Sequence, residues 1–371
     1  MNDERGTRKQ RPHPVIPSVA RDLGEVGAIH VPRAARPPRS LATLGMTGWA
    51  PGVSNRSSSV HVLSLRSSLV TETLERLRTA KKVAFVFSGG SARAAFQVGV
   101  IERLLALGVT PAMTIGVSAG AWNAALVSAG IGSRGRYFWR SFMRMPDVDL
   151  RNLFIERSPW RYAEMHRRNF ARFVGDRLHA PGALPCLISV TRLSDRSNAL
   201  IDARDVERPI DLLLATNFLP PFYTRTPLVL GERFGDGGVS DNAPYEAAFA
   251  HGCDAVVLVT LKGESEGGIY KRTSDVDHVI PVQYRDRVVV IRPRHRLPYG
   301  FLERRWAKIA ELIALGDLRA REVLLGERHP ETDLRAAGPS PTVRLLRAWQ
   351  KIRGVRGSGG EAPAPAEQAQ P

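Results

Sequence analysis

The chain has 371 residues, of which 43% are hydrophobic, 24% charged and 7% aromatic, a composition that excludes a wholly disordered chain. Lys and Arg outnumber Asp and Glu by 53 to 36, and the resulting net charge of +17 favours anionic partners such as nucleic acid or acidic lipid surfaces. No apolar run reaches the ~18 residues that a membrane-spanning helix needs.

Residues 1–71 differ from the rest, because they are rich in Arg, Pro and Ser and hold no sustained apolar period. No apolar stretch follows the charged start, so the pattern does not predict a secretory signal. We expect a disordered extension, or upstream sequence read from a start codon assigned too early. The folded domain is expected over 72–353, and residues 354–371 have the composition of a flexible low-complexity tail.

The folded part alternates short apolar runs with helical periods. Residues 83–87 predict a buried strand that enters a glycine loop, and 94–108 carry apolar side chains at helical spacing. A short strand, a turn at 116–120 and a helix of small residues follow. Further strands are expected at 186–191, 255–260 and 287–293, and further helices at 301–325 and 342–352. This alternation predicts an α/β fold whose parallel sheet is covered by helices on both faces.

The two cysteines, Cys186 and Cys253, are too few for a disulfide framework or a cysteine zinc site. Each lies in or beside an apolar run, which is typical of a buried free thiol. We therefore expect both thiols to be free and buried.

The segment Gly116-Val117-Ser118-Ala119-Gly120 is a G-x-S-x-G pattern between a predicted strand and a predicted helix. A serine on such a sharp turn has a strained backbone, and small flanking residues let the helix pass the strand. The N–H groups at the start of that helix point toward charge that develops at a reacting carbonyl. The pattern alone is weak in a chain with 33 glycines, but this context favours a nucleophilic Ser118 over a mere tight turn.

A glycine loop, Ser88 to Arg93, ends the first predicted strand and opens a helix. Consecutive glycines let backbone N–H groups converge on an anion, which is either a phosphate or an oxyanion. The loop matches neither the Walker pattern nor G-x-G-x-x-G, so a phosphate site is disfavoured. With a nucleophile on the adjacent strand, we predict an oxyanion hole formed by Gly89, Gly90 and Ser91, with the cation of Arg93 beside it.

An aspartate before two glycines, Asp236-Gly237-Gly238, is usually a plain turn. Its interpretation changes here because a serine nucleophile needs a base, and Asp236 is the outstanding candidate. A histidine base is the rival hypothesis, and chain order permits the histidines that follow the aspartate: His251, His278, His295 and His329. None of them has a glycine-rich or strand-end context that would present it to the serine, so we do not expect a triad.

The three motifs, in this order, resemble the patatin-like phospholipase family, and the similarity extends over about residues 83–325. The resemblance implies a three-layer α/β/α sandwich with a mostly parallel central sheet over 72–353. It further implies hydrolysis of acyl esters of phospholipids or other lipids, of the phospholipase A or lysophospholipase type, by a Ser118–Asp236 dyad. Neither a metal nor a cofactor is implied, and the expected location is cytoplasmic or peripheral at a membrane.

Two residues depart from the family pattern. Ser91 and Ala94 stand where the family commonly has glycine, and an added Cβ is disfavoured wherever φ is positive or the backbone approaches the substrate closely. These departures are the only support for an alternative hypothesis, a catalytically impaired protein with the same fold that binds lipid or regulates a partner.

Residues 134–177 hold eleven arginines and five acids, with aromatic residues interleaved. Three interpretations are open: a solvated helical face over core aromatics, a surface that meets anionic phospholipid headgroups, or a nucleic-acid surface. No recognised nucleic-acid motif accompanies the charge, so nucleic acid is not expected as a partner. For the membrane alternative, Arg140, Arg144 and Arg151 are the expected contacts, with Trp139 or Trp160 at the interface if either side chain is exposed.

Overall fold

The computed structural model describes residues 72–333 apart from 147, 156–157, 221, 224, 270–278 and 301–302. The predicted extension over 1–71, the predicted tail over 354–371 and the expected helix over 342–352 therefore lie outside the described residues. A helix over residues 72–79 leads into the first strand.

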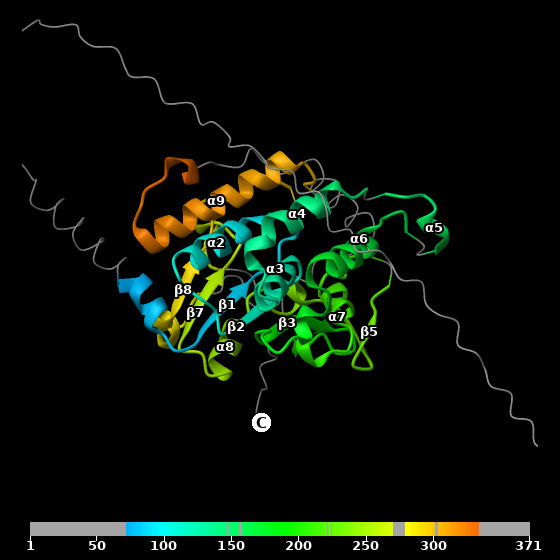
Figure 1. The fold of residues 1–371 in the computed structure, drawn as a ribbon, viewed down its shortest axis with the longest axis horizontal. Helices are drawn as coiled ribbons and strands as arrows, with labels where there is room; N and C mark the ends of the chain where they lie inside the picture. Colours follow the sequence, from blue (N-terminus) through cyan, green and yellow to red (C-terminus); the bar gives the residue numbers. More distant parts are fainter. Residues whose placement is uncertain are drawn as a thin grey trace, which may run out of the picture. The chain divides into compact units, whose positions relative to one another are not determined.

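Eight strands within the described residues form one mixed sheet (Figure 1). They are β1 (Val83–Phe87), β2 (Met113–Val117), β3 (Cys186–Arg192), β4 (Asn198–Asp202), β5 (Leu228–Val229), β6 (Glu232–Asp236), β7 (Ala255–Val259) and β8 (Val288–Ile291). The order is β5-β6-β3-β2-β1-β7-β8, with β4 also paired to β3. The neighbours β3, β2, β1, β7 and β8 run parallel, whereas β4, β5 and β6 pair antiparallel. The predicted parallel sheet is confirmed, and the antiparallel strands are an addition to it.

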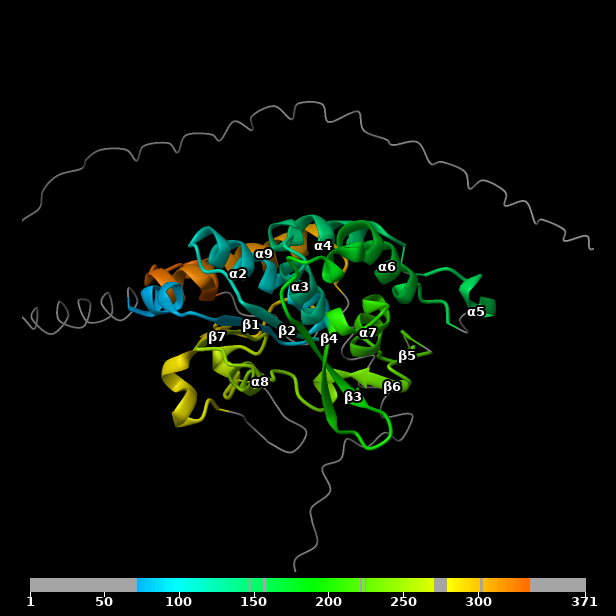
Figure 2. The ribbon, with the colours of Figure 1, turned by 60° about the horizontal axis from the view of Figure 1, so that its bottom comes forward.

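Helices cover both faces of the sheet (Figure 2). They are α2 (Ala95–Ala106), α3 (Ala119–Ser128), α4 (Gly135–Arg144), α5 (Asn152–Ile155), α6 (Tyr162–Asn169), α7 (Pro209–Thr216), α8 (Glu246–Ala250) and α9 (Trp306–Leu325). Residues of β1 alternate between the two faces. Phe85 and Phe87 join the large core under α2, α3 and α9, while Ala84 and Val86 join a smaller core under α8. This arrangement confirms the α/β/α sandwich.

Both cysteines are free and buried, as predicted from their apolar surroundings. Cys186 belongs to the larger core and Cys253 to the smaller one. Burial raises the pKa of the Cys186 thiol to about 12, so this sulfur stays protonated and is inert as a nucleophile at neutral pH.

The long helix α9 packs against α2 at two facing glycines. A Cβ on Gly99 would lie 1.9 Å from the carbonyl oxygen of Ile313, and one on Gly316 would lie 1.9 Å from that of Phe96. Only glycine at both positions allows this close approach of the two backbones. Because α2 continues directly from the glycine loop after β1, α9 supports the helix that carries that loop.

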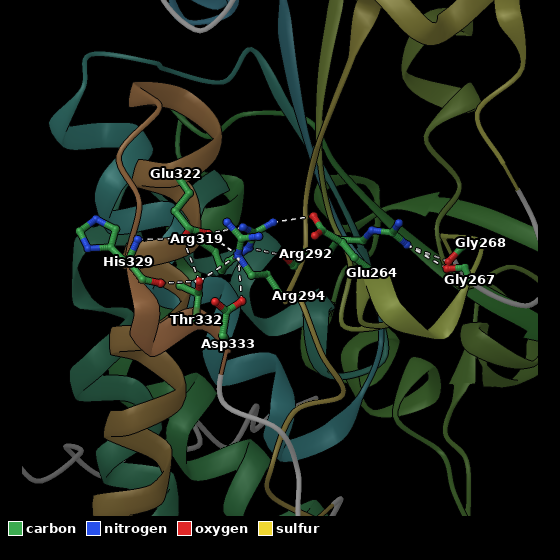
Figure 3. A network of polar contacts seen from close by, with 10 residues as sticks. All are labelled: Glu264, Gly267, Gly268, Arg292, Arg294, Arg319, Glu322, His329, Thr332 and Asp333. Atoms are coloured by element: carbon green, nitrogen blue, oxygen red, sulfur yellow. Dashed lines mark hydrogen bonds and ion pairs between the residues drawn. The ribbon is translucent and has the colours of Figure 1, made fainter. Parts of the chain in front are cut away.

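A buried polar network, shown in Figure 3, ties α9 to the loops that follow β7 and β8. Arg319 on α9 donates to the carbonyl oxygen of Arg292 (2.8 Å) and pairs with Glu264 (2.6 Å) and with Glu322. Glu322 also accepts hydrogen bonds from Thr332 and from the N–H of His329. Burial alone would raise the pKa of Glu322, but these hydrogen bonds and the one from Arg294 lower it to about 2. The carboxylate is therefore ionised and paired.

We expect Arg319→Met to destabilise the fold by about 3 kcal/mol, because it leaves buried carboxylates without their cation. Lys308→Met is the matched control, since Lys308 forms an i,i+3 pair with Glu311 on the same helix, but 34% of the Lys308 side chain and 52% of the Glu311 side chain are exposed. The control should cost less than about 1 kcal/mol. Urea denaturation of both variants checks the difference, and equal losses would contradict the importance assigned to the buried network.

Candidate active site

Strand β3 brings Ser118 and Asp236 together. Ser118 follows β2, whose last residue, Val117, pairs with Ser189 of β3, and Asp236 ends β6 and pairs with the next residue, Val190. Because β4 occupies the opposite edge of β3 over these residues, β2 and β6 share one edge and their ends meet. Two residues that are far apart in the sequence thus become neighbours.

The serine lies on a strained turn. Ser118 has φ 50° and ψ −125°, and α3 begins at the next residue. A Cβ on Gly116 would lie 2.5 Å from Cα of Ala121, and one on Gly120 would lie 2.5 Å from the carbonyl oxygen of Phe87. The two glycines of the G-x-S-x-G pattern are therefore required by the close passage of α3 over β1 and β2.

A buried threonine holds this turn to β3. The hydroxyl of Thr216, at the end of α7, accepts a hydrogen bond from the N–H of Ser118 (2.9 Å) and donates one to the carbonyl oxygen of Ser189 (2.6 Å). The strained serine backbone is thus fixed to the strand that also pairs with the aspartate strand.

Ser118 Oγ donates a hydrogen bond of 2.7 Å to Asp236 Oδ2. The other carboxylate oxygen accepts from the N–H of Gly238 at 2.8 Å, and a Cβ on Gly238 would lie 3.1 Å from that same oxygen, a tight contact that favours glycine. A Cβ on Gly237 would lie 2.1 Å from the carbonyl oxygen of Ser189, so this turn also packs tightly on β3. Desolvation raises the pKa of Asp236 to about 6, although the two hydrogen bonds oppose the shift. The carboxylate is ionised at neutral pH and is more basic than an ordinary aspartate.

The glycine loop after β1 lies beside this pair. The N–H of Gly89 donates to Asn242 Oδ1 at 2.7 Å, so that donor is engaged. A Cβ on Gly90 would lie 2.4 Å from Cδ1 of Leu261. Ser91 lines the same cavity as Ser118 and Asp236 and has φ 53°, a left-handed conformation that glycine adopts without strain.

Arg93 does not line that cavity. Burial lowers the pKa of its guanidinium, and the nearby cation of Arg296 lowers it further. Its predicted place beside the oxyanion hole stays a prediction.

A cavity of about 700 Å³, counting solvent at its mouth, opens above the Ser118–Asp236 pair. Its wall is mainly aromatic and aliphatic and includes Trp122, Phe138, Phe142, Tyr162, Leu219 and Phe222. An apolar cavity with a few convergent polar groups at one end is typical of a small-molecule site, and its wall suits an acyl chain.

The helix α4 supplies part of this wall from the arginine-rich segment. Phe138, Trp139 and Phe142 are buried, while Arg140 and Arg144 on the opposite side are exposed. The interpretation as a solvated face over core aromatics is correct for α4. Trp139 does not meet the condition of exposure set for a membrane contact, because this side chain is buried and its Nε1 donates to Asn123 Oδ1 at 3.0 Å.

One histidine in the cavity wall was missed by the sequence reasoning. His166 on α6 stacks on Phe142, and its Nδ1 shares a hydrogen bond of 2.7 Å with the hydroxyl of Tyr223. Burial lowers its pKa to about 3, with help from the cations of Arg304 and Arg167, so the ring is neutral. The sequence analysis considered only histidines that follow Asp236, as the chain order of an α/β-hydrolase triad requires. His166 was not considered because it precedes Asp236 in the chain. Of the four histidines considered there, His251, His295 and His329 do not line the cavity and His278 lies outside the described residues.

No cluster of three or more His, Cys, Asp or Glu side chains suited to a metal ion occurs in the described part of the chain. None of the helices described for residues 72–333 has the length and apolar character needed to span a bilayer.

Residues 85–249 match the family model described as Patatin-like phospholipase. This region is a patatin-like phospholipase domain. The match confirms the family resemblance. It begins within β1 and contains β2 to β6, with Ser118, Asp236 and the glycine loop. The elements β7, β8 and α9, which the resemblance also covers, lie beyond the matched residues.

A 61-residue segment, 16% of the chain, is 44% identical to human 1-acylglycerol-3-phosphate O-acyltransferase PNPLA3. That segment spans 12% of the length of this relative. Among solved structures, the chain is similar to VipD from Legionella pneumophila, with 12% identity, coverage of 74% of both chains and a TM-score of 0.40. A human GIVD cytosolic phospholipase A2 in complex with a fluorophosphonate shares 12% identity over 81% of this chain and 65% of its own, with a TM-score of 0.42.

The two departures from the family pattern differ in backbone conformation, which predicts opposite effects of restoring glycine. Ser91→Gly should stabilise the domain by about 0.5–1 kcal/mol, because it removes a Cβ from a left-handed residue. Ala94→Gly should destabilise it by about 1 kcal/mol, because Ala94 has helical φ and ψ at the start of α2. Chemical denaturation of the two variants serves as a matched pair, and a shift of the same sign in both would contradict this distinction.

Proposed function

We propose that this protein hydrolyses carboxylic esters of lipids, of the phospholipase A or lysophospholipase type, through an acyl-serine intermediate. The observation that carries the proposal is the hydrogen bond of 2.7 Å from Ser118 Oγ to the carboxylate of Asp236, beneath an apolar cavity. The patatin-like phospholipase domain supports the same class of substrate.

In the first half of the reaction, Ser118 Oγ attacks the ester carbonyl carbon and its proton passes to Asp236 Oδ2. The N–H groups of Gly90 and Ser91 are the proposed donors to the resulting oxyanion, since the N–H of Gly89 is bound to Asn242. When the tetrahedral intermediate collapses, the bond to the leaving alcohol breaks and that alcohol takes the proton from Asp236.

In the second half, Asp236 takes a proton from water as the water oxygen attacks the acyl-serine. The second tetrahedral intermediate expels Ser118 Oγ, which recovers a proton from Asp236, and the fatty acid leaves. An alcohol on a second lipid could replace water in this step, which would make the reaction an acyl transfer such as the name of the human relative PNPLA3 describes. Product analysis with and without a lysophospholipid acceptor distinguishes the two outcomes.

Ser118→Ala and Asp236→Asn should each lower hydrolysis of a soluble p-nitrophenyl ester by about 10³-fold or more, because each removes an essential member of the proposed dyad. Thr226→Ser is a suitable control, since its hydroxyl contacts Phe234 on the same strand as the aspartate but does not line the cavity. Substantial activity in either dyad variant would reject the mechanism. Activity that survived Asp236→Asn but vanished with His166→Gln would favour a histidine base.

The strained Ser91 favours one alternative, a catalytically impaired protein that binds lipid or regulates a partner. Labelling with a fluorophosphonate probe separates the two functions, because the probe reacts only with an activated serine. Labelling of the wild type that is lost in Ser118→Ala supports the hydrolase, whereas folded wild-type protein that resists the probe supports the binding role.

The raised pKa of Asp236 predicts the pH dependence of the reaction. The base must be ionised, so kcat/KM should rise with pH through about 6 and level off above it. Below that value we expect a fall of about tenfold per pH unit. Initial rates with the soluble ester, with circular dichroism as the control for unfolding, measure this profile. A flat profile across pH 5–7 in folded protein would rule out Asp236 as a base with this pKa.

A further inference from the structure

The connection between α4 and α6 carries apolar side chains that face solvent. Val148, Leu150, Leu153 and Phe154 are all exposed, and Phe154 has 92% of its surface accessible. The last two lie on the short helix α5, which Figures 1 and 2 place beyond α6, at the outer end of the described elements. We name these four side chains the apolar tip. Such a cluster indicates a surface that binds something apolar, because soluble proteins seldom leave grouped large apolar side chains in water.

Cations accompany the apolar tip. Arg144 ends α4, Arg151 follows Leu150 of the tip in the chain, and both arginine side chains are exposed. Neither forms an ion pair with a carboxylate of the described residues, and Asp149 between them accepts the backbone N–H of Arg151 instead. Further exposed arginines follow on α6, where Arg168 pairs with Glu164 while Arg167 has no described acidic partner.

Exposed apolar side chains beside exposed arginines indicate the chemistry of the partner. An anionic phospholipid surface offers phosphate groups to the guanidinium groups and, a few ångströms deeper, an apolar layer to Phe154 and Leu150. Nucleic acid would satisfy the arginines but would leave the aliphatic tip residues in water. The four apolar side chains and the two arginines are therefore explained together by a bilayer interface.

The tip is joined in the chain to two elements that line the cavity of the candidate active site. Phe142 and Met143, at the end of α4, and Tyr162, at the start of α6, line that cavity, and the tip lies in the chain between them. Docking through the tip would therefore hold the ends of α4 and α6, which supply part of the cavity wall, to the bilayer.

We propose that the apolar tip, residues 148–154, inserts into the interface of an anionic phospholipid bilayer, with Arg144 and Arg151 at the headgroups. This proposal rests on the proposed function in one respect, since the bilayer lipid is then the substrate. It moves the aromatic contact from the tryptophans expected from the sequence to Phe154.

The buried cysteines make a direct test possible. Because Cys186 and Cys253 are both buried, Phe154→Cys provides an accessible thiol for an environment-sensitive fluorophore. Leu230→Cys is the matched control, since Leu230 is 66% exposed in the turn between β5 and β6. Vesicles of phosphatidylglycerol and phosphatidylcholine should increase and blue-shift the emission at position 154 and leave it unchanged at 230. No response at 154, or an equal response at 230, would overturn the proposal.

Cosedimentation with the same vesicles gives an independent measurement. The double variant Leu150→Ser/Phe154→Ser should bind about tenfold more weakly or worse, because the inserted apolar area is lost. Arg144→Ser/Arg151→Ser should reduce the preference for anionic over neutral vesicles, while Leu230→Ser should bind as the wild type does. Undiminished binding of the first double variant would reject the tip as the docking surface.

The two proposals fail in different measurements. Hydrolysis of the soluble ester and its loss in Ser118→Ala test the catalytic function without a membrane, and they also report whether each tip variant keeps an intact cavity. A fluorophore response at 154 in a protein that hydrolyses no ester would leave docking established and the hydrolase rejected. The reverse result would reject docking alone.

Discussion

The hydrogen bond between Ser118 and Asp236 depends on strand β3. This strand pairs both with β2, which leads to Ser118, and with β6, which ends at Asp236. Along a single edge of β3, β2 arrives in parallel and β6 in antiparallel direction, so their last residues face Ser189 and Val190. The same strand provides the contacts that fix both loops. Ser189 accepts from Thr216, which binds the N–H of Ser118, and Thr191 donates to the carbonyl oxygen of Asp236 at 2.7 Å. A shift of one residue in either register would turn alternate side chains to the other face and separate the pair.

A carboxylate that accepts directly from a serine must gain basicity from its surroundings. Desolvation supplies this basicity by raising the pKa of Asp236 to about 6, and the same upward shift makes the stability of the fold depend on pH. The folded state binds this proton more tightly than the unfolded state does. The fold therefore loses stability as pH rises from 3.8, the ordinary pKa of aspartate, to about 6. The hydrogen bonds from Ser118 and Gly238 limit that cost. A base of this kind sacrifices some stability for reactivity, as functional sites commonly do.

Motif spacing predicted the serine, the aspartate and the parallel core of the sheet because glycines and apolar runs are local signals. Strand β6, with the sequence ERFGD, has no alternation of apolar and polar residues, and its place is set by pairing with β3. His166 likewise reaches the cavity only through the packing of α6. The burial of Trp139 was left open for a different reason, since the segment was interpreted by its composition. Helical periodicity alone places Phe138, Trp139 and Phe142 on one side of α4 and Arg140 and Arg144 on the other.

Two serines with positive φ face the same cavity, Ser91 in the glycine loop and Ser118 in the elbow. Each conformation costs on the order of 1–2 kcal/mol and persists only where the surrounding packing determines it. For Ser118 the packing comes from inside the family match, through Thr216 and the glycines that let α3 approach β1. For Ser91 the packing comes partly from residues beyond the family match. Ser91 lies just before α2, and α2 packs on α9, which the Arg319 network fixes to the loops after β7 and β8. One of those loops contains Leu261, whose side chain packs so closely on Gly90 that it leaves no room for a Cβ there. The elements beyond residue 249 therefore complete the support of the glycine loop.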